Sequence, residues 1–153
     1  MADVAVLYPI DYLESVYIFN GGYNVPSDSN YITLTDILST ELRIDFTYLH
    51  PSVLDEKCTV NGNILHLENE VNYENYKLIV IPSMKVISLS NLEKIYEFYQ
   101  NGGVVISVGT LPDQATRAED DESVRKIISD MFGNTSTAQS VNTNDKGGAA
   151  YHA

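Results

Sequence analysis

Two patterns of apolar residues alternate along this chain. Short runs rich in apolar and β-branched residues predict four strands, and the most continuous of them are typical of a parallel sheet that is buried on both faces. These runs are "VAVLY" at residues 4–8, "DFTYLH" at 45–50, "YKLIVIP" at 76–82 and "VVISV" at 104–108. Between them the chain needs helices or loops to return to the start of the next strand.

Apolar residues at helical spacing predict three such helices. The first covers residues 31–43, and the second begins at a capping box of Ser90 and Glu93 and ends at Gly102. The third begins at the acidic residues 119–122, which suit the positive end of a helix dipole. The inner positions of the three helices are Leu34, Ile37, Leu38 and Leu42; Leu92, Ile95, Tyr96 and Tyr99; and Val124, Ile127, Ile128 and Met131.

One segment predicts antiparallel pairing. Residues 58–68 alternate around Asn61, Gly62 and Asn63, and Asn-Gly supplies the positive φ angles that a tight hairpin turn requires. Elsewhere, strands that alternate with helices imply parallel pairing through right-handed crossovers. The predicted fold is therefore α/β, a flavodoxin-like three-layer α/β/α sandwich with a mostly parallel sheet and a small β-hairpin excursion.

The chain is expected to divide into an α/β domain at residues 1–133 and a flexible polar tail or linker at 134–153. Its 153 residues fit one ordinary domain. The last twenty residues, "NTSTAQSVNTNDKGGAAYHA", show little periodicity and are rich in small polar residues. This ending, together with a start only three residues before a core strand, suggests a domain cut from a longer protein.

The charge balance narrows the expected partners. Twenty-one acidic residues against nine Lys and Arg give a net charge of -12, which would repel a phosphate backbone, so no nucleic-acid partner is expected. No apolar run approaches the roughly 20 residues that cross a bilayer, so no membrane partner is expected either. The N-terminus "MADVAVLYP" carries no signal peptide, and the localisation stays unknown, with a periplasmic or secreted parent protein as one option.

No residue is assigned a catalytic or metal-binding role. Thr110 follows the run at 104–108, where many α/β enzymes place their chemistry, but the sequence offers neither an activating base nor oxyanion donors. The preferred interpretation is a turn residue whose hydroxyl satisfies nearby backbone. Cys58 is the single cysteine and excludes an internal disulfide or a multi-cysteine zinc site, and the three histidines lack the i, i+4 spacing of a metal site.

Ligands of parallel sheets bind where strands end at their carboxyl side, so three loops matter here: 9–12, 83–86 and 109–113. Polar and aromatic residues around these loops form the candidate ligand-binding set. They are Tyr8, Asp11, Tyr12, Ser83, Thr110 and Asp113.

The first strand exit argues against a nucleotide or flavin. It reads "YPIDYLES", which has no glycine-rich phosphate loop, and Asp11 and Glu14 would repel a phosphate. No cofactor is therefore expected. Tyr8, Asp11, Tyr12 and Tyr17 instead offer the aromatic faces and carboxylates of a carbohydrate-binding lip, the alternative to ordinary loop packing.

Two resemblances bear on function. "YKLIVIP" followed by "ISLSNLEKIYEFYQNGGVVISVG" resembles the second half of a class I glutamine amidotransferase-like domain. In that family the strand after Gly-Gly delivers a catalytic cysteine in a Gly-x-Cys-x-Gly elbow. Here the segment is Gly109-Thr110-Leu111-Pro112, without the cysteine or the second glycine, and no His-x-Glu follows, so amidotransferase activity does not carry over.

The longer string "HPSVLDEKCTVNGNILHLENEVNYENYKLIVIPSMKVIS", continued by "GTLPDQATRAEDDESV", is similar to a domain embedded in large bacterial glycoside hydrolases of the α-L-rhamnosidase type. It is distantly similar to the trimerisation domain of some β-galactosidases. Such domains are accessory, and a separate barrel carries the catalytic carboxylates. The resemblance covers residues 4 to about 133.

The resemblance implies a non-catalytic accessory or structural domain of a multidomain glycoside hydrolase, one that supports the catalytic domain or an oligomer interface. The expected partners are neighbouring domains, a second copy of the chain, or a carbohydrate. Two other classes stay open: a carbohydrate-binding module that uses the tyrosine-rich first loop, and a hydrolase or amidotransferase with a site at the strand ends. Whether this chain is itself an enzyme is uncertain from sequence alone.

Overall fold

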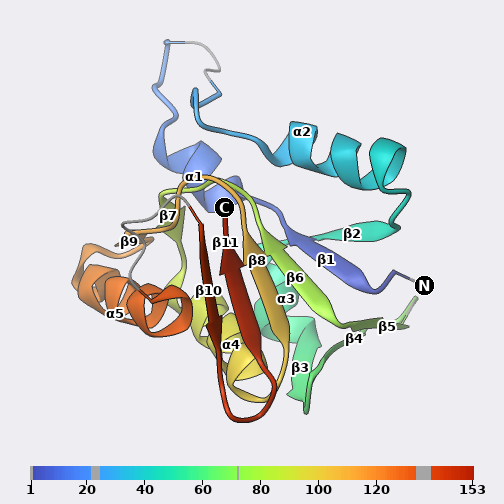
Figure 1. The fold of residues 1–153 in the computed structure, drawn as a ribbon. Helices are drawn as coiled ribbons and strands as arrows, with labels where there is room; N and C mark the ends of the chain where they lie inside the picture. Colours follow the sequence, from blue (N-terminus) through green and yellow to red (C-terminus); the bar gives the residue numbers. More distant parts are fainter. Residues whose placement is uncertain (1, 22–24, 72, 134–138) are drawn as a thin grey trace.

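A six-stranded sheet forms the centre of the molecule (Figure 1). The computed structural model describes residues 2–21, 25–71, 73–133 and 139–153. In spatial order the strands are β10 (Ser140–Thr143), β11 (Ala149–His152), β8 (Val104–Ser107), β6 (Leu78–Ile81), β1 (Val4–Leu7) and β2 (Phe46–Leu49). All neighbours pair in parallel except β10 and β11. Counted along the chain, the parallel strands lie in the order 2-1-3-4-5, a common doubly wound arrangement. The predicted α/β class is confirmed.

A small antiparallel sheet stands beside the main one. It contains β3 (Cys58–Asn61), β4 (Ile64–Glu68) and β5 (Tyr73–Tyr76). The predicted hairpin joins β3 and β4, and Gly62 in its turn has a φ of 59°. β5 was not predicted, because the polar residues around it obscure the alternation of a strand. A further short parallel pair joins β7 (Val86–Ile87) and β9 (Gln114–Ala115).

The helices agree with the prediction in part. They are α1 (Ile10–Ser15), α2 (Tyr31–Asp36) with its π-helical continuation η1 (Ile37–Glu41), α3 (Pro51–Lys57), α4 (Leu89–Gln100), the 3-10 turn η2 (Ala118–Asp120) and α5 (Asp121–Phe132). The three predicted helices correspond to α2 with η1, α4 and α5. α1 and α3 were missed because each has only six or seven residues. Pro51 both follows β2 and opens α3, since a proline in the first helical turn loses no hydrogen bond.

The predicted capping box at the start of α4 is wrong. The N-cap is Ser88, whose Oγ accepts a hydrogen bond from the backbone N–H of Asn91 at 3.3 Å. Ser90 instead donates to the Asp55 carboxylate on α3 at 2.6 Å. Ser88 therefore caps α4, whereas Ser90 joins α4 to α3. The spacing of residues in the sequence does not distinguish these two roles.

The expectation of an unstructured tail is also wrong for residues 139–153. β10 and β11 form a hairpin, and β11 lies inside the main sheet between β10 and β8. Ala149 and Ala150 are buried there, and small side chains produce little of the periodicity on which sequence patterns depend. Residues 134–138 of the expected tail lie outside the described residues.

The two faces of the main sheet are covered unequally. On one face, α3, α4 and α5 bury alternate strand residues, among them Leu7, Ile81 and Val105, in the larger core. On the other face, Leu38 of η1 packs with Val4, Val6 and Val80 in a smaller core. Among the described residues no helix continues this second layer over β8, β11 and β10 (Figure 1). The second helical layer of the sandwich is thus half complete.

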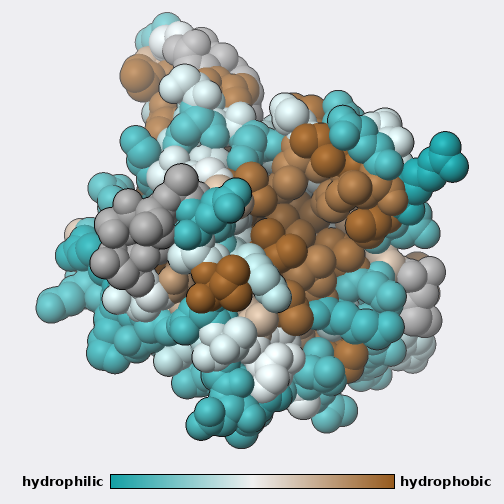
Figure 2. Space-filling view, viewed as in Figure 1, coloured by the Kyte–Doolittle hydropathy of each residue, from teal (hydrophilic) through white to brown (hydrophobic). Residues whose placement is uncertain are grey.

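The part of the sheet without helices is mostly apolar. We call it the open face; its residues are Leu78, Val104, Ile106, Val141, Thr143, Ala149 and Tyr151, of which Leu78 also packs against the smaller core. Val141 is 64% exposed and Tyr151 41%. Figure 2 shows contiguous apolar surface on this side of the molecule, from below α2 across the central strands. Within the described residues, no helix is both long and apolar enough to cross a membrane.

Candidate functional site

Polar side chains from four segments meet where the parallel strands end at their carboxyl side. Ser83 follows β6, Thr110 follows β8, and Tyr12 projects from α1. Asp28 and Asn30 come from the loop that leads into α2. We call these five residues the Asp28 cluster, because the Asp28 carboxylate bonds to three of the other four.

Asp28 accepts hydrogen bonds from three hydroxyl groups. Tyr12 Oη donates to Asp28 Oδ1 at 2.8 Å, and Thr110 Oγ1 donates to Asp28 Oδ2 at 2.9 Å. Ser83 Oγ lies 3.5 Å from the same Oδ2 and accepts a bond from the backbone N–H of Thr110 at 3.0 Å. The carboxylate thereby ties the loop before α2 to the exits of two strands.

Asn30 adds a second link between the same segments. Its Oδ1 accepts from the backbone N–H of Ser83 at 2.8 Å, and its Nδ2 donates to the carbonyl of Val108 at 2.9 Å. Gly109 has a φ of 90°, and a Cβ added there would lie 2.8 Å from the Ser83 Cβ. This turn therefore requires glycine both for its conformation and for the close approach of the two strand exits.

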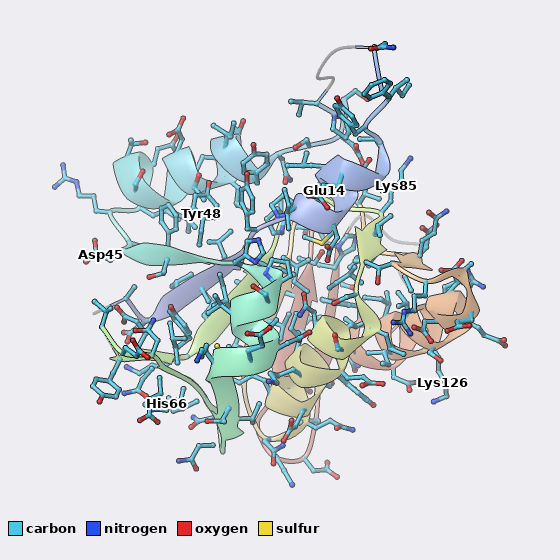
Figure 3. All side chains as sticks on the ribbon, turned by 180° about the vertical axis from the view of Figure 1, so that it is seen from behind. Glu14, Asp45, Tyr48, His66, Lys85 and Lys126 are labelled. Carbon is cyan, nitrogen blue, oxygen red and sulfur yellow. The ribbon has the colours of Figure 1, made fainter. Side chains whose placement is uncertain are left out.

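The electrostatics of the cluster favour an ionised Asp28 and a neutral Tyr12. Partial burial raises the pKa of Asp28, but hydrogen bonds from Tyr12 and Thr110, with the charge of Lys85, outweigh it and lower that pKa below 3.8. Burial, followed by the bond to Asp28, raises the pKa of Tyr12 to about 12. Figure 3 shows Lys85 at the end of the molecule where α1 lies, the end that also carries Glu14. A carboxylate held ionised in this way is a weak base.

This geometry corrects one expectation about Thr110. The sequence offered no base near its hydroxyl, yet the Asp28 carboxylate lies at 2.9 Å. The other requirement of a nucleophile, a set of oxyanion donors, is not met by the backbone here. The N–H of Gly109 donates to the Ala153 carbonyl at 2.7 Å, and the N–H of Thr110 is bound to Ser83. The backbone N–H groups of Gly109 and Thr110 are therefore both engaged in hydrogen bonds within the strand exit.

The structure brings together half of the candidate ligand-binding set. Tyr12, Ser83 and Thr110 meet in the Asp28 cluster, whereas Tyr8 packs edge-on against Tyr31 and Tyr48 at ring distances of 5.7 Å. Tyr48 projects from β2 toward α2 in Figure 3.

The other two predicted carboxylates point elsewhere. Asp11 is half-buried on α1, and burial, followed by the charge of Glu14, raises its pKa. Asp113 is exposed beside Arg125, whose Nη1 donates to the Asp113 carbonyl at 3.2 Å. Ligand binding by the six predicted residues stays a prediction.

Sequence reasoning missed Asp28 and Asn30, the two residues that organise the site. They lie in the segment "PSDSN", which was passed over as a loop before the first long helix. Asp, Asn and Ser in such a segment commonly bond to backbone and neighbouring hydroxyls, and this composition was the available signal. Nothing in the local sequence shows that the acceptor would reach Tyr12 and Thr110, 16 and 82 residues away.

The remaining reactive side chains have structural surroundings. Cys58 is buried, and burial raises the pKa of its thiol to about 11, so the thiolate is disfavoured. His50 caps α3, accepting from the Ser52 N–H, while His66 lies 2.6 Å from Asn75 in the small sheet. Within the described ranges, no three His, Cys, Asp or Glu side chains are grouped to hold a metal ion.

Comparison with known proteins places the fold. No protein-family model and no curated protein matches the chain. Among solved structures, a rhamnosidase from Novosphingobium sp. PP1Y matches 99% of this chain with a TM-score of 0.58 and 16% identity. Gan42B, a GH42 beta-galactosidase, also matches 99%, with a TM-score of 0.62 and 13% identity. The matches span 13% and 27% of those longer chains. At these identities the likeness is one of fold.

Proposed function

We propose that this chain is a non-catalytic accessory domain of a larger glycoside hydrolase, and that its open face packs against another part of that polypeptide. The likeness of the whole fold to segments of a rhamnosidase and a beta-galactosidase supports the choice of parent. The amidotransferase-like resemblance belongs to the same proposal, in which the turn at Gly109 is the remnant of an elbow that has lost its cysteine.

The observation that carries the proposal is the half-covered sheet. Parallel sheets are ordinarily covered on both faces, because each buried strand has apolar residues on both sides. Here β8 and β11 lie inside the sheet, yet Ile106 is only partly buried and its neighbour Tyr151 is 41% exposed. A contiguous apolar surface of this kind marks an interaction site on a soluble protein.

The net charge of the chain favours another segment of the same polypeptide, over a second copy of the chain, as the partner that covers the open face. Each copy carries a net charge of -12, so two copies brought face to face would repel one another. A segment of the same polypeptide is held close by its covalent link and needs no such approach between like charges. Self-association through this face is the competing outcome that the experiment must separate.

The test compares Val141→Asp with Val71→Asp, which replaces a valine that is 91% exposed and outside the open face. In the isolated chain both variants should stay folded and monomeric by sedimentation velocity, and only Val141→Asp should reduce binding of a dye for apolar surfaces. In the longer gene product, Val141→Asp alone should lower the melting temperature. The proposal would be contradicted if the isolated chain formed dimers that Val141→Asp dissociates. Equal melting temperatures of Val141→Asp and Val71→Asp in the longer gene product would contradict it as well.

A further inference from the structure

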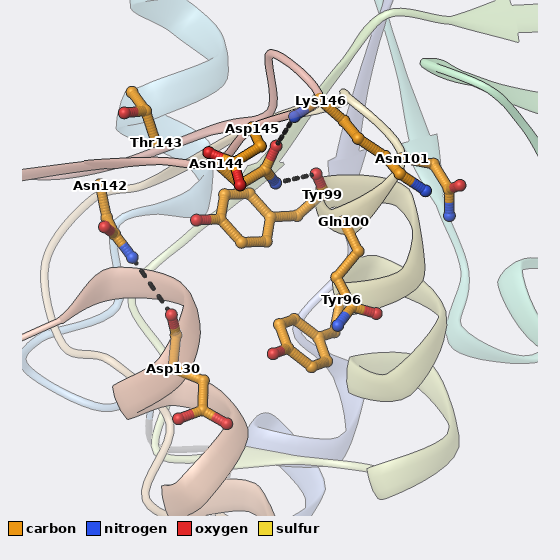
Figure 4. Close-up of a pocket in the computed structure, with 10 residues that line it drawn as sticks. All are labelled: Tyr96, Tyr99, Gln100, Asn101, Asp130, Asn142, Thr143, Asn144, Asp145 and Lys146. Carbon is orange, nitrogen blue, oxygen red and sulfur yellow. Dashed lines mark hydrogen bonds between the residues drawn. The ribbon is translucent and has the colours of Figure 1, made fainter.

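A second polar region lies away from the strand exits and the open face. A pocket of about 660 Å³ opens between the C-terminal half of α4, the end of α5 and the β10–β11 hairpin (Figure 4). This volume falls within the range of small-ligand sites. Its lining comes from residues 96–101, Asp130 and 142–146.

Two tyrosines form the aromatic wall of this pocket. Tyr96 and Tyr99 are three residues apart on α4 and share one face of the helix. Their rings stack at a centroid distance of 6.2 Å with an interplanar angle of 16°. Tyr99 is 4% exposed and Tyr96 is half-buried, so Tyr99 lies deeper and Tyr96 offers more surface to a ligand.

Hydrogen bonds hold the opposite wall in place. Asn144 Nδ2 donates to the carbonyl of Tyr99 at 2.7 Å, and its Oδ1 accepts from the backbone N–H groups of Lys146 and Gly148. A Cβ on Gly148 would overlap the Tyr99 carbonyl oxygen, at 2.0 Å, so glycine allows the hairpin to lie directly on α4. Asn142 Nδ2 donates to the carbonyls of Asp130 and Met131. These bonds fix the pocket before any ligand enters.

The residues that line the pocket are mixed in character. They include the acidic Asp130 and Asp145, the basic Lys146 and the two tyrosines. The two carboxylates and the net charge of -12 disfavour phosphate ligands. A metal ion is disfavoured as well, because Asp130 is paired with Lys126 at 3.0 Å and Lys146 lines the same space.

We propose that this pocket binds a neutral saccharide unit. An aromatic wall packs against the C–H face of a sugar ring, while carboxylate, amide and hydroxyl groups around it bond to the sugar hydroxyls. The proposal is independent of the role of the open face. It concerns α4 and the last hairpin, whereas the sequence offered a carbohydrate-binding lip in the first loop as an alternative to ordinary loop packing.

Saturation-transfer NMR of the isolated chain with methyl glycosides of neutral hexoses and of rhamnose tests the proposal. The wild type should transfer saturation to at least one glycoside. Tyr96→Ala and Asp145→Ala should weaken that binding at least tenfold, and Tyr73→Ala, at an exposed tyrosine on β5, should leave it unchanged. Asp145 is exposed on the hairpin, so its variant separates lost binding from lost folding.

Three results would overturn the proposal. The first is no saturation transfer from the wild type to any glycoside. The second is unchanged glycoside binding by both Asp145→Ala and a folded Tyr96→Ala. The third is equal weakening by Tyr73→Ala, which would place the contact elsewhere. None of these results bears on whether the open face packs against a larger protein, which the melting comparison of Val141→Asp with Val71→Asp decides separately.

Discussion

The Asp28 cluster and the open face differ in what they leave unsatisfied. At the cluster, a buried tyrosine hydroxyl, two further hydroxyls, a carboxylate and the strand-exit amides bond to one another. At the open face, apolar side chains up to 64% exposed have no covering layer among the described residues. Doubly wound sheets ordinarily bind ligands at the first location and bury the second.

This contrast assigns different roles to the two regions. Polar groups that already have partners gain little from a ligand, since binding would exchange one set of hydrogen bonds for another. Apolar side chains in water gain free energy from any surface that covers them. The strand exits therefore stabilise the domain, whereas in the proposed function the open face supplies the driving force for packing against the rest of a larger protein.

The largest expected effect comes from substitution of Gly109, and a matched control distinguishes backbone strain from close packing there. Gly109→Val should lower the free energy of unfolding by about 3 kcal/mol, because it combines a positive φ with contact against Ser83. Gly147→Val is the matched control: its φ is 86°, but nothing lies within 4 Å of the added Cβ. Urea unfolding should show a smaller cost there, and equal costs would mean that the packing against Ser83 contributes nothing.

Removal of the central acceptor should have the next largest effect. Asp28→Ala should lower the free energy of unfolding by about 2 kcal/mol, because the buried Tyr12 hydroxyl and those of Thr110 and Ser83 lose their shared partner. Asp113→Ala, at an exposed carboxylate outside the cluster, should change it by less than about 0.5 kcal/mol. If chemical denaturation gives both variants the same stability, the cluster is not a stabilising unit.

The stability of the wild type should also depend on the charge of Asp28. Its pKa is lowered in the folded chain despite the opposing effect of burial, so the ionised form is favoured by folding. The resulting stabilisation is present above the ordinary carboxyl pKa of 3.8 and is lost as the pH falls through the lower folded value. Across this acidic range, the free energy of unfolding should fall more steeply with decreasing pH for the wild type than for Asp28→Asn. Parallel profiles would contradict the assignment.

The smallest of these effects concerns Thr110. Thr110→Ala should cost about 1 kcal/mol, the range of a modest hydrogen bond at a half-buried site, and Thr110→Ser should restore most of it. If the proposed function holds, neither variant should change glycoside hydrolysis by the larger glycoside hydrolase. A stable but inactive Thr110→Ala protein would show that the strand exit still performs chemistry.

The sequence predicted those parts of the fold that depend on local pattern. The four apolar runs, the Asn-Gly hairpin and the three long helices each carry their signal within a dozen residues. β11 carries almost none, because Ala149 and Ala150 are too small to mark a buried strand, and its place depends on pairing with β8. Short helices such as α3 also give no clear signal, since one or two turns are too few to show the helical spacing of apolar residues.

In the candidate site, too, the sequence predicted some features and missed those that depend on distant contacts. Strand-exit reasoning brought Tyr12, Ser83 and Thr110 together correctly, because the carboxyl ends of parallel strands meet at one edge. It missed Asp28, because the side chain that fills this edge comes from a loop whose path no periodic pattern records. The open face was equally hidden, since Val104 and Ile106 continue the apolar run of β8 as residues of a strand covered on both faces would.

The most direct test of the central claim is hydroxyl-radical footprinting of Tyr151 on β11 with Tyr73 on β5 as internal reference. Tyr151 is 41% exposed and Tyr73 is 59% exposed in the isolated chain. If the open face packs against another part of a larger glycoside hydrolase, the oxidation rate of Tyr151 should fall severalfold in the longer gene product while that of Tyr73 stays the same. An unchanged rate at Tyr151 in the longer protein would contradict the account.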